Sequence, residues 1–457
     1  MRESPTPVLS IFDATMITVG IVIGAGIFQT PALVASITGT PALMILAWLL
    51  GGALSLIGAL TYAELAGACP SAGGDYTFLT RAYGRHVSFL FAWARSMVIC
   101  TGSIALLGYI LGDYLTRLYD LGPYSAAWYA ALAVVLLTTI NLAGLRRSAR
   151  LQNVLTLLEI AGVLLVALAA IGLSLGMGAG MELNAGTAAS TEAEAAPAGP
   201  GAFGLAMVFV LLTFGGWNEA AYVSAEVRGG PPAILRTLLI SIALITTVYL
   251  IFVVSIMYGL GWEGLTGSDA VGVDVMQRAL GPIGAPLIGA IVAVASLTSM
   301  NSTMIVGARS NYAAARDWPA LGFMGRWRGD RNTPVIGFVV QATISLGLIA
   351  FGAFEHDGFS TMVEFTAPVF WFFFMLTGFT LFIQRRRNPK ADRPFSIPLY
   401  PVLPAIFVLT CLYLFYASIM YARSQHATHI AFAVMLSGVA VWAMLWRADA
   451  RRSSPAP

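Results

Sequence analysis

Long apolar segments recur along almost the whole chain, from Ile11 to Trp446. Each runs for roughly 20 residues, the length at which an α-helix crosses ~30 Å of hydrocarbon. These segments lack the alternation of apolar and polar residues that is typical of membrane β-strands. Because 58% of the residues are hydrophobic and only 10% are charged, the chain has too little polar surface to be surrounded by water. The sequence therefore predicts an all-α integral membrane protein that lies in a lipid bilayer.

We predict twelve transmembrane helices in one domain that covers residues 1–457. No long polar linker separates them. Residues 176–202 are rich in Gly, Ala, Ser and Thr and are predicted to be a flexible outer loop. The predicted spans are 11–36, 41–66, 87–116, 126–144, 150–174, 203–226, 234–260, 283–312, 334–353, 360–384, 399–421 and 428–446.

The basic residues predict how the spans are oriented. All but four of the Lys and Arg residues fall at or near one face of this arrangement; Arg117, Arg278 and Arg423 lie near the other face, and Arg95 lies inside a span. Short cytoplasmic loops carry the excess of Lys and Arg, so an even number of crossings places both termini in the cytoplasm. The net charge of +3 is thus explained by topology, and no nucleic-acid partner is expected.

Two of the predicted spans contain glycine-rich interruptions. The first reads Gly24-Ala25-Gly26, and the sixth reads Phe214-Gly215-Gly216-Trp217. Neighbouring glycines, each costing a helix about 1 kcal/mol relative to Ala, let the backbone unwind and approach a ligand. Close helix packing through small residues is the alternative for either motif alone. Because the motifs open spans 1–5 and spans 6–10, they occupy matching positions of two repeats and favour a substrate site at mid-membrane.

At these residues the chain resembles the amino acid-polyamine-organocation (APC) superfamily of permeases, and within it the L-type amino acid transporter-like branch. The resemblance extends over residues 9–422. Three further motifs carry it, which are Tyr62-Ala63-Glu64-Leu65, Ser71-Ala72-Gly73-Gly74-Asp75-Tyr76 and Ala313-Ala314-Ala315-Arg316-Asp317.

The resemblance implies a fold and a mechanism. The expected fold has two inverted five-helix repeats, residues 11–174 and 203–384, followed by two C-terminal helices within residues 399–446. Helices 1 and 6 are expected to be broken at mid-membrane, and transport is expected to proceed by alternating access.

The interruptions then predict how an amino acid would bind. Its carboxylate is expected at the free amides of Gly24, Ala25 and Gly26, where a half-helix begins. On the family's pattern its ammonium would bind backbone carbonyls of both broken spans. The candidate carbonyls are those of Ile21 or Val22 in the first span, and of Leu212, Thr213 or Phe214 beside Gly215 and Gly216 in the sixth.

Several side chains near these interruptions are candidates for selectivity or gating. Phe214 is either a pocket wall or a packing residue, and Trp217 beside it is a further gating candidate. Asn218 resembles a family position that bonds to the first span or to substrate, and Asn301 matches a family Asn near the same centre. Glu226, which lies among Arg228 and Arg236, is expected to form a structural ion pair.

Glu159 departs from the family, because many relatives carry Lys at this place beside the unwound part of the first span. In sodium-coupled transporters a sodium ion takes that place. A buried carboxylate here either takes up a proton or holds a cation during transport, or it pairs structurally with a buried arginine such as Arg95.

These features predict a permease that moves L-amino acids, foremost neutral ones, across a plasma membrane of the bacterial inner-membrane type, as an exchanger or as a proton symporter. Protons are thus a candidate co-substrate. The alternatives are an amino acid sensor of the same fold that does not transport, and a transporter of cationic amino acids or polyamines.

No catalytic site, metal or cofactor is expected. The pattern Gly172-Leu173-Ser174-Leu175-Gly176 lacks the strand that a nucleophile elbow requires, and Cys69, Cys100 and Cys411 form no ligand motif. The loop 118–125 has no cysteine for a disulfide-linked subunit, so the chain is expected to act alone or as a loose oligomer.

Overall fold

The described part of the chain is helical throughout. The computed structural model describes residues 5–177, 200–268, 270–353, 358–390, 393–424 and 436–447. Within these residues there is no β-strand, and extended pairing is confined to two isolated bridges, Leu9 with Val227 and Arg328 with Thr333. Ten helices in the described part of the chain are long and apolar enough to cross a membrane. The predicted all-helical, multi-pass architecture is confirmed, whereas the total of twelve spans and the inverted repeats stay predictions.

The helices follow one another with short connections. The α-helices are α1 (Ile11–Val22), α2 (Thr30–Thr38), α3 (Pro41–Ala68), α4 (Asp75–Tyr83), α5 (Arg85–Ala94), α6 (Cys100–Leu118), α7 (Ser125–Leu142), α8 (Leu145–Ser174), α9 (Pro200–Thr213), α10 (Gly230–Thr266), α11 (Val271–Leu280), α12 (Gly284–Asp317), α13 (Val335–Gly352), α14 (Gly358–Arg387) and α15 (Val402–Ser424). The shorter segments are the 3₁₀ turns η1 (Ala25–Phe28), η3 (Trp217–Glu226), η4 (Gly281–Ile283) and η5 (Pro319–Leu321), and the π-helical turn η2 (Arg95–Ile99).

Predicted spans 2 to 11 each correspond to helical segments of the structure. Two predicted spans, the first and the sixth, are divided into shorter segments. The predicted span 11–36 is divided into α1, η1 and α2, and the predicted span 203–226 is divided into α9 and η3. Of the predicted span 428–446, residues 428–435 lie outside the described residues and 436–446 are helical. Most of the predicted outer loop 176–202 also lies outside them.

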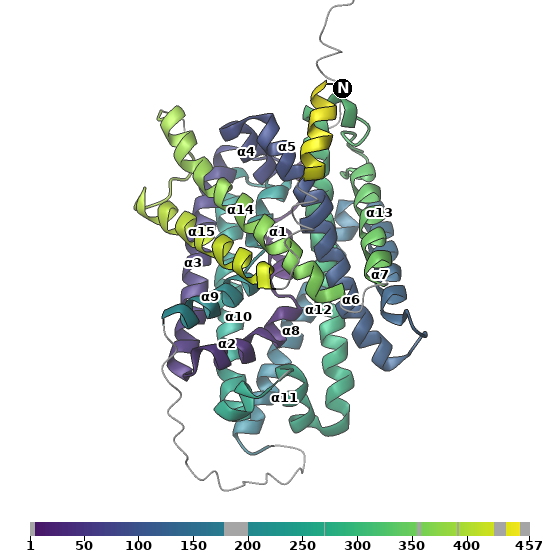
Figure 1. The fold of residues 1–457 in the computed structure, drawn as a ribbon, viewed down its shortest axis with the longest axis vertical. Coiled ribbons are helices and arrows are strands. Elements are labelled where there is room, and N and C mark those ends of the chain that lie inside the picture. The colour runs from purple at the N-terminus through teal and green to yellow at the C-terminus, as the bar shows by residue number, and fades with distance from the viewer. Residues whose placement is uncertain are drawn as a thin grey trace, which may run out of the picture.

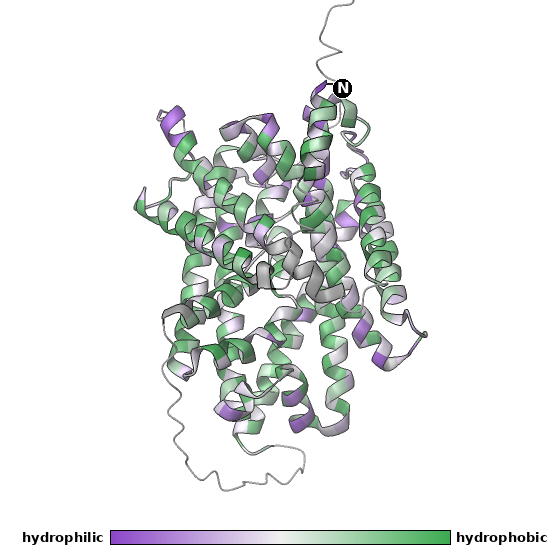
Figure 2. Ribbon diagram, in the orientation of Figure 1, coloured by the Kyte–Doolittle hydropathy of each residue, from purple (hydrophilic) through white to green (hydrophobic). Residues whose placement is uncertain are grey.

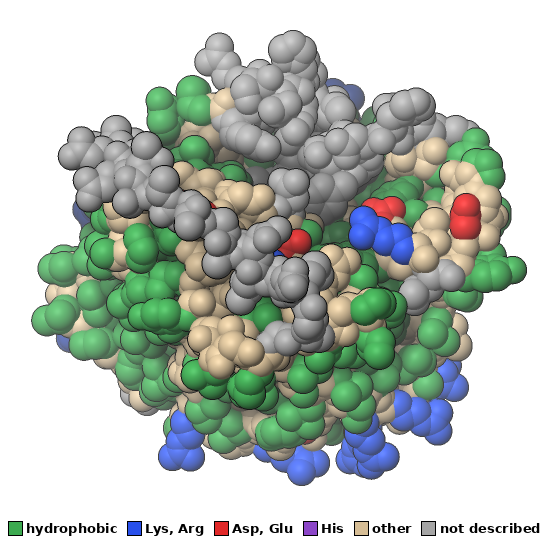
Figure 3. Space-filling model, turned by 90° about the horizontal axis from the view of Figure 1, so that it is seen from below, with side chains coloured by type: hydrophobic (Ala, Val, Ile, Leu, Met, Phe, Trp, Pro, Cys, Tyr) green, Lys and Arg blue, Asp and Glu red, His purple; other side chains and the backbone are tan. Residues whose placement is uncertain are grey.

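The long helices run roughly along one axis of the molecule (Figure 1). α10 packs against α3 and α8, and α12 packs against α6 and α8, so that α1 lies among α8, α10 and α12. Hydrophilic residues gather toward the two ends of this axis (Figure 2), and apolar side chains cover most of the circumference (Figure 3). This distribution is the one expected where the sides of a molecule face lipid.

Helix α1 is placed by a cap at its start and by a close approach near its end. The Ser10 hydroxyl accepts a hydrogen bond from the Asp13 amide at 3.1 Å, and the Asp13 carboxylate accepts one from the Ser10 amide at 2.9 Å. Near the other end, a Cβ on Gly20 would lie only 2.4 Å from side-chain atoms of Gln152 and Thr156. The glycine therefore lets α1 touch α8, which fixes the position of the chain just before its first interruption.

Candidate functional site

The first helical interruption follows Val22. The Gly24 amide turns back to the Val22 carbonyl at 2.8 Å, and Gly24 adopts an extended conformation before η1 begins at Ala25. Among the described residues, no group accepts a hydrogen bond from the amides of Ala25 or Gly26. The Gly26 position is exposed. The interruption thus presents two unused backbone donors at the start of a helical turn, which is the arrangement that binds a carboxylate.

The second interruption follows Thr213. The Gly215 amide donates to the Leu212 carbonyl at 3.0 Å, and Gly216 has a φ of 112° before the 3₁₀ turn begins at Trp217. That conformation favours glycine, and a Cβ at this residue would also lie 2.5 Å from the Ile21 side chain. The glycine is therefore needed twice, once for the backbone turn and once because the two interruptions touch. Both predicted helix breaks are confirmed.

Tyr249 of α10 connects the two interruptions. Its hydroxyl lies 2.7 Å from the Val22 carbonyl oxygen and 3.1 Å from the Thr213 carbonyl oxygen. A hydroxyl has one proton, so it donates to only one of these carbonyls at a time. No sequence pattern marks Tyr249, because a tyrosine within an apolar span looks the same as a packing residue.

The candidate carbonyls for an ammonium group differ in availability. Val22 and Thr213 face the Tyr249 hydroxyl, and Leu212 accepts from the Gly215 amide. Within the described chain, nothing donates to the carbonyls of Ile21 or Phe214. These last two are the acceptors that remain free beside the interruptions.

Aromatic rings surround this region. Phe214 is buried between Trp48 and Tyr249, with ring centroids 6.0 Å and 5.0 Å away. Trp217 packs 5.3 Å from the Tyr62 ring and 5.5 Å from the Phe374 ring. Phe214 therefore lies on the α3 and α10 side of the second interruption, while Trp217 belongs to a cluster with α3 and α14. Leu212, by contrast, is 40% exposed.

The two candidate asparagines lie in different environments. Asn218 is buried, and neither its side-chain oxygen nor its nitrogen has a hydrogen-bond partner, so both atoms are free for a ligand. Asn301 is fully bonded away from the interruptions, because it donates to Gln152 at 2.7 Å and accepts from Asn141 at 2.8 Å. The structure brings Asn218, but not the Asn301 side chain, to the interruptions as a free polar group.

Glu159 is fully buried and both of its carboxylate oxygens lack a partner. It follows Asn153 and Thr156 on the face of α8 that contacts α1, where Asn153 donates to Asp13 at 2.7 Å and Thr156 donates to the Met16 carbonyl at 3.0 Å. A spacing of three residues thus aims Glu159 at the end of α1. The considered ion pair between Glu159 and Arg95 is wrong.

Arg95 instead forms a two-pronged ion pair with Glu219 of η3. The Arg95 Nη1 lies 2.9 Å from Glu219 Oε1, and the Nη2 contacts the other carboxylate oxygen. The guanidinium also lies 3.9 Å from the centre of the Tyr222 ring, and the Tyr222 hydroxyl donates to Asp75 at 3.0 Å. The four side chains are buried and join η2, η3 and α4. The start of α6 is thereby tied to the segment after the second interruption.

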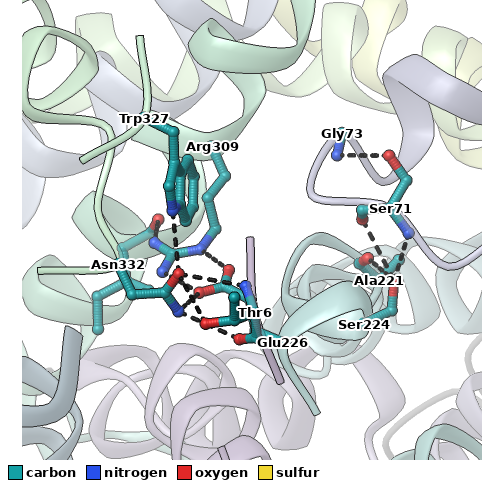
Figure 4. A network of polar contacts seen from close by, with 10 residues as sticks. Thr6, Ser71, Gly73, Ala221, Ser224, Glu226, Arg309, Trp327 and Asn332 are labelled. Carbon is teal, nitrogen blue, oxygen red and sulfur yellow. Dashed lines mark hydrogen bonds and ion pairs between the residues drawn. The ribbon is translucent and has the colours of Figure 1, made fainter. Parts of the chain in front are cut away.

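A second buried pair closes the far end of η3. Glu226 pairs with Arg309 of α12, so an ion pair is confirmed at Glu226, but its partner is neither Arg228 nor Arg236. Asn332 donates to Glu226 at 3.3 Å and to the Thr6 carbonyl at 3.2 Å. Figure 4 shows these groups converging from separate segments. Because the partners are far apart in the sequence, no local motif predicts these contacts.

The sequence agrees with that of known transport proteins over most of its length. A model of the amino acid permease family matches residues 9–445. The chain belongs to the amino acid permease family. This membership confirms the resemblance to the APC superfamily that the motifs indicated, and the family consists of transporters rather than enzymes.

Individual relatives carry more specific names. The human cystine/glutamate transporter is 25% identical over 437 residues, which cover 94% of this chain and 83% of the relative. The human b(0,+)-type amino acid transporter 1 is 27% identical over 90% of this chain and 82% of the relative. The serine/threonine exchanger SteT of Bacillus subtilis is 24% identical over 88% of each chain.

The Arg95–Glu219 pair yields a prediction about stability. Replacing Glu219 with Met leaves a buried guanidinium without its carboxylate, which costs about 3–5 kcal/mol in comparable pairs. We expect Glu219→Met and Arg95→Met each to unfold at a clearly lower temperature, and the double variant to recover much of the loss. Thermal unfolding of each purified variant in nanodiscs measures these unfolding temperatures.

The exposed pair Arg328–Asp330 provides the control. Its side chains are 51% and 59% exposed, so Asp330→Asn should leave the unfolding temperature nearly unchanged. A double variant that is no more stable than either single variant would show that the ion pair is not what holds η3 to the start of α6.

Asp75 yields a prediction about pH. The pKa of the Asp75 carboxyl is raised from 3.8 to about 6, chiefly by burial and in part by the charge of Glu219, against the lowering effects of Tyr62, Arg95 and Tyr222. Because the pKa is higher in the folded protein, protonated Asp75 stabilises the fold below pH 3.8, and this contribution is lost as the pH rises through about 6. We expect Asp75→Asn to unfold at a higher temperature than the wild type at pH 7.5.

The difference between Asp75→Asn and the wild type should shrink as the pH is lowered from about 6 toward 4. Thermal unfolding scans across this range measure the difference, and Asp120→Asn, at an exposed carboxyl, is the matched control. A constant difference at all these pH values would contradict the assignment.

Proposed function

We propose that this protein is a permease for neutral L-amino acids that works by alternating access in a plasma membrane of the bacterial inner-membrane type. The observation that carries the proposal is the contact between the two helical interruptions, the first of which has free amides and each of which has a free carbonyl. Family membership and the names of the relatives support amino acids as the substrate class.

The carboxylate of the substrate binds the amides of Ala25 and Gly26 in this proposal, with Gly24 supplying room beside them. Both amides lack acceptors, and they stand at the start of a helical turn where the backbone dipole is positive. A Cβ at Gly26 would meet only the Thr30 hydroxyl, at 3.9 Å, so the space in front of these amides is open.

The ammonium of the substrate binds the Ile21 and Phe214 carbonyls, which have no donor among the described residues. The Val22 and Thr213 carbonyls become available when the Tyr249 hydroxyl turns away from one of them. Asn218 supplies a neutral polar group nearby. Phe214 and its ring neighbours favour an uncharged side chain, since a buried charge without a partner is costly.

Glu159 is the coupling group of the proposal. It is buried without any partner among the described residues, on α8, which packs against both α1 and α10. A carboxylate in such a place is strongly favoured to take up a proton, and a proton there changes the charge beside the first interruption. We assign Trp217 and Asn301 supporting roles, in which each holds its helix in place against its neighbours.

The topology that completes the proposal has twelve spans, two inverted repeats and cytoplasmic termini. The basic residues support the orientation, and the equivalent interruptions after α1 and α9 support the repeat. Residues 11–174 and 203–384 are the two repeats, and residues 399–446 form the remaining two helices. The protein then acts as a monomer or a loose oligomer.

Blocking the interruption tests the substrate site. We expect Gly26→Val to lower uptake of a radiolabelled neutral amino acid mixture into preloaded proteoliposomes at least about tenfold, because the added side chain fills the space where the carboxylate binds. The matched control is Gly347→Val, at an exposed helix position where a Cβ meets nothing within 4 Å. Equal uptake by both variants would exclude the Gly26 site, and no uptake by the wild type would favour a sensor.

Removing the Glu159 charge tests the coupling. Uptake into empty vesicles with an inward proton gradient should be abolished by Glu159→Gln, while exchange in preloaded vesicles persists, because the amide cannot take up a proton. Glu263→Gln, at an exposed carboxylate, should leave both activities unchanged. Wild-type uptake that requires internal amino acid and ignores the gradient would identify an exchanger and exclude the proton role.

A further inference from the structure

A cavity of about 510 Å³ opens near the end of η3, and it is separate from the helical interruptions. Its walls come from the segment before α1 (Pro5), the connection between α3 and α4, the α4 helix, Ala225 of η3, and the last turns of α12. Figure 4 shows two polar clusters of this region, one with Ser71 and Ser224 and the other with Asn332 and Glu226. The cavity therefore lies where four segments from distant parts of the chain meet.

The charged groups of the cavity are unequal in number. Arg81 and Arg316 line it, and neither forms an ion pair with a carboxylate of the described residues. The Arg81 guanidinium contacts the Cys69 sulfur, and the Arg316 guanidinium lies 5.9 Å from the Tyr312 ring. Asp317 is the acidic residue of the lining, and its carboxylate accepts a hydrogen bond from Tyr76 at 2.8 Å. The lining thus carries one net positive charge and two arginines without an anionic partner.

The walls also provide polar groups of the right kind for a small anion. Ser71, Thr77 and Thr80 add hydroxyls to the lining. Arginine binds carboxylates with paired hydrogen bonds, and its binding energy rises where the site is partly enclosed. A volume of this size suits a molecule of a few carbon atoms together with water.

We propose that this cavity binds a small carboxylate-bearing molecule through Arg81 and Arg316. The bound carboxylate bridges α4 and α12, the two helices that carry these arginines, and so stabilises the packing of both against η3. Two sources share this chemistry, a free dicarboxylate and the transported amino acid itself after it leaves the interruptions. Binding stands on the cavity alone, whereas any effect on transport rests on the proposed function.

Calorimetric titration of the full-length protein in nanodiscs tests the binding, with succinate as the probe and succinamide as its neutral counterpart. We expect succinate to bind and succinamide not to, and Arg81→Gln and Arg316→Gln each to weaken succinate binding about tenfold, because each removes a charge-assisted hydrogen bond. Arg326→Gln, at an exposed arginine outside the cavity, should bind like the wild type. Both cavity arginines are exposed, so these variants should fold, and unfolding scans check that they do.

A second titration distinguishes the sources. In the Gly26→Val background, L-serine binding that Arg316→Gln weakens would identify the amino acid as the occupant; succinate binding without L-serine binding would identify a dicarboxylate. The proposal is overturned if neither succinate nor L-serine binds, if succinamide binds as tightly as succinate, or if Arg81→Gln and Arg316→Gln bind like Arg326→Gln. Because this readout is binding, it stands even if the protein fails to transport.

Discussion

Every interruption of a helix inside a membrane releases backbone groups that lipid cannot satisfy. In this protein the two interruptions pack against each other and share one hydrogen-bonding side chain. They touch at Gly216 and Ile21. The Tyr249 hydroxyl lies within hydrogen-bond distance of one carbonyl of each, Val22 and Thr213. The amides of Ala25 and Gly26 and the carbonyls of Ile21 and Phe214 keep no partner among the described residues. All four are main-chain groups, so the polar groups that the interruptions leave free include no charged side chain.

Charged side chains within the bundle follow a different rule. Arg95 with Glu219, Arg309 with Glu226, and Arg385 with Glu64 form buried or half-buried pairs that join segments distant in sequence. Pairing lowers the cost of burying each charge. Glu159 breaks the rule, since it is buried and unpaired. Within the described residues, Glu159 therefore differs from the carboxylates that join helices through ion pairs.

The sequence predicted the interruptions well because glycine carries its own physical signal. A run such as Gly24-Ala25-Gly26 weakens a helix wherever it lies, and the break follows from local chemistry. Tertiary partners carry no such signal. Glu226 and Arg309 lie 83 residues apart, and Asn332 lies 106 residues from Glu226, so their meeting depends on the path of the whole chain. For the same reason the partner of Arg95 could not be chosen among the available carboxylates from sequence alone.

The segment before α1 is fastened to the end of η3 by main-chain bonds. The amides of Val8 and Leu9 both donate to the Glu226 carbonyl at 2.9 Å, and the Arg228 amide donates to the Leu9 carbonyl at 2.8 Å. These bonds therefore join the start of α1, which precedes the first interruption, to the end of η3, which follows the second. Neither segment can move outward alone without breaking these three hydrogen bonds, so a rearrangement at this end would move both segments together.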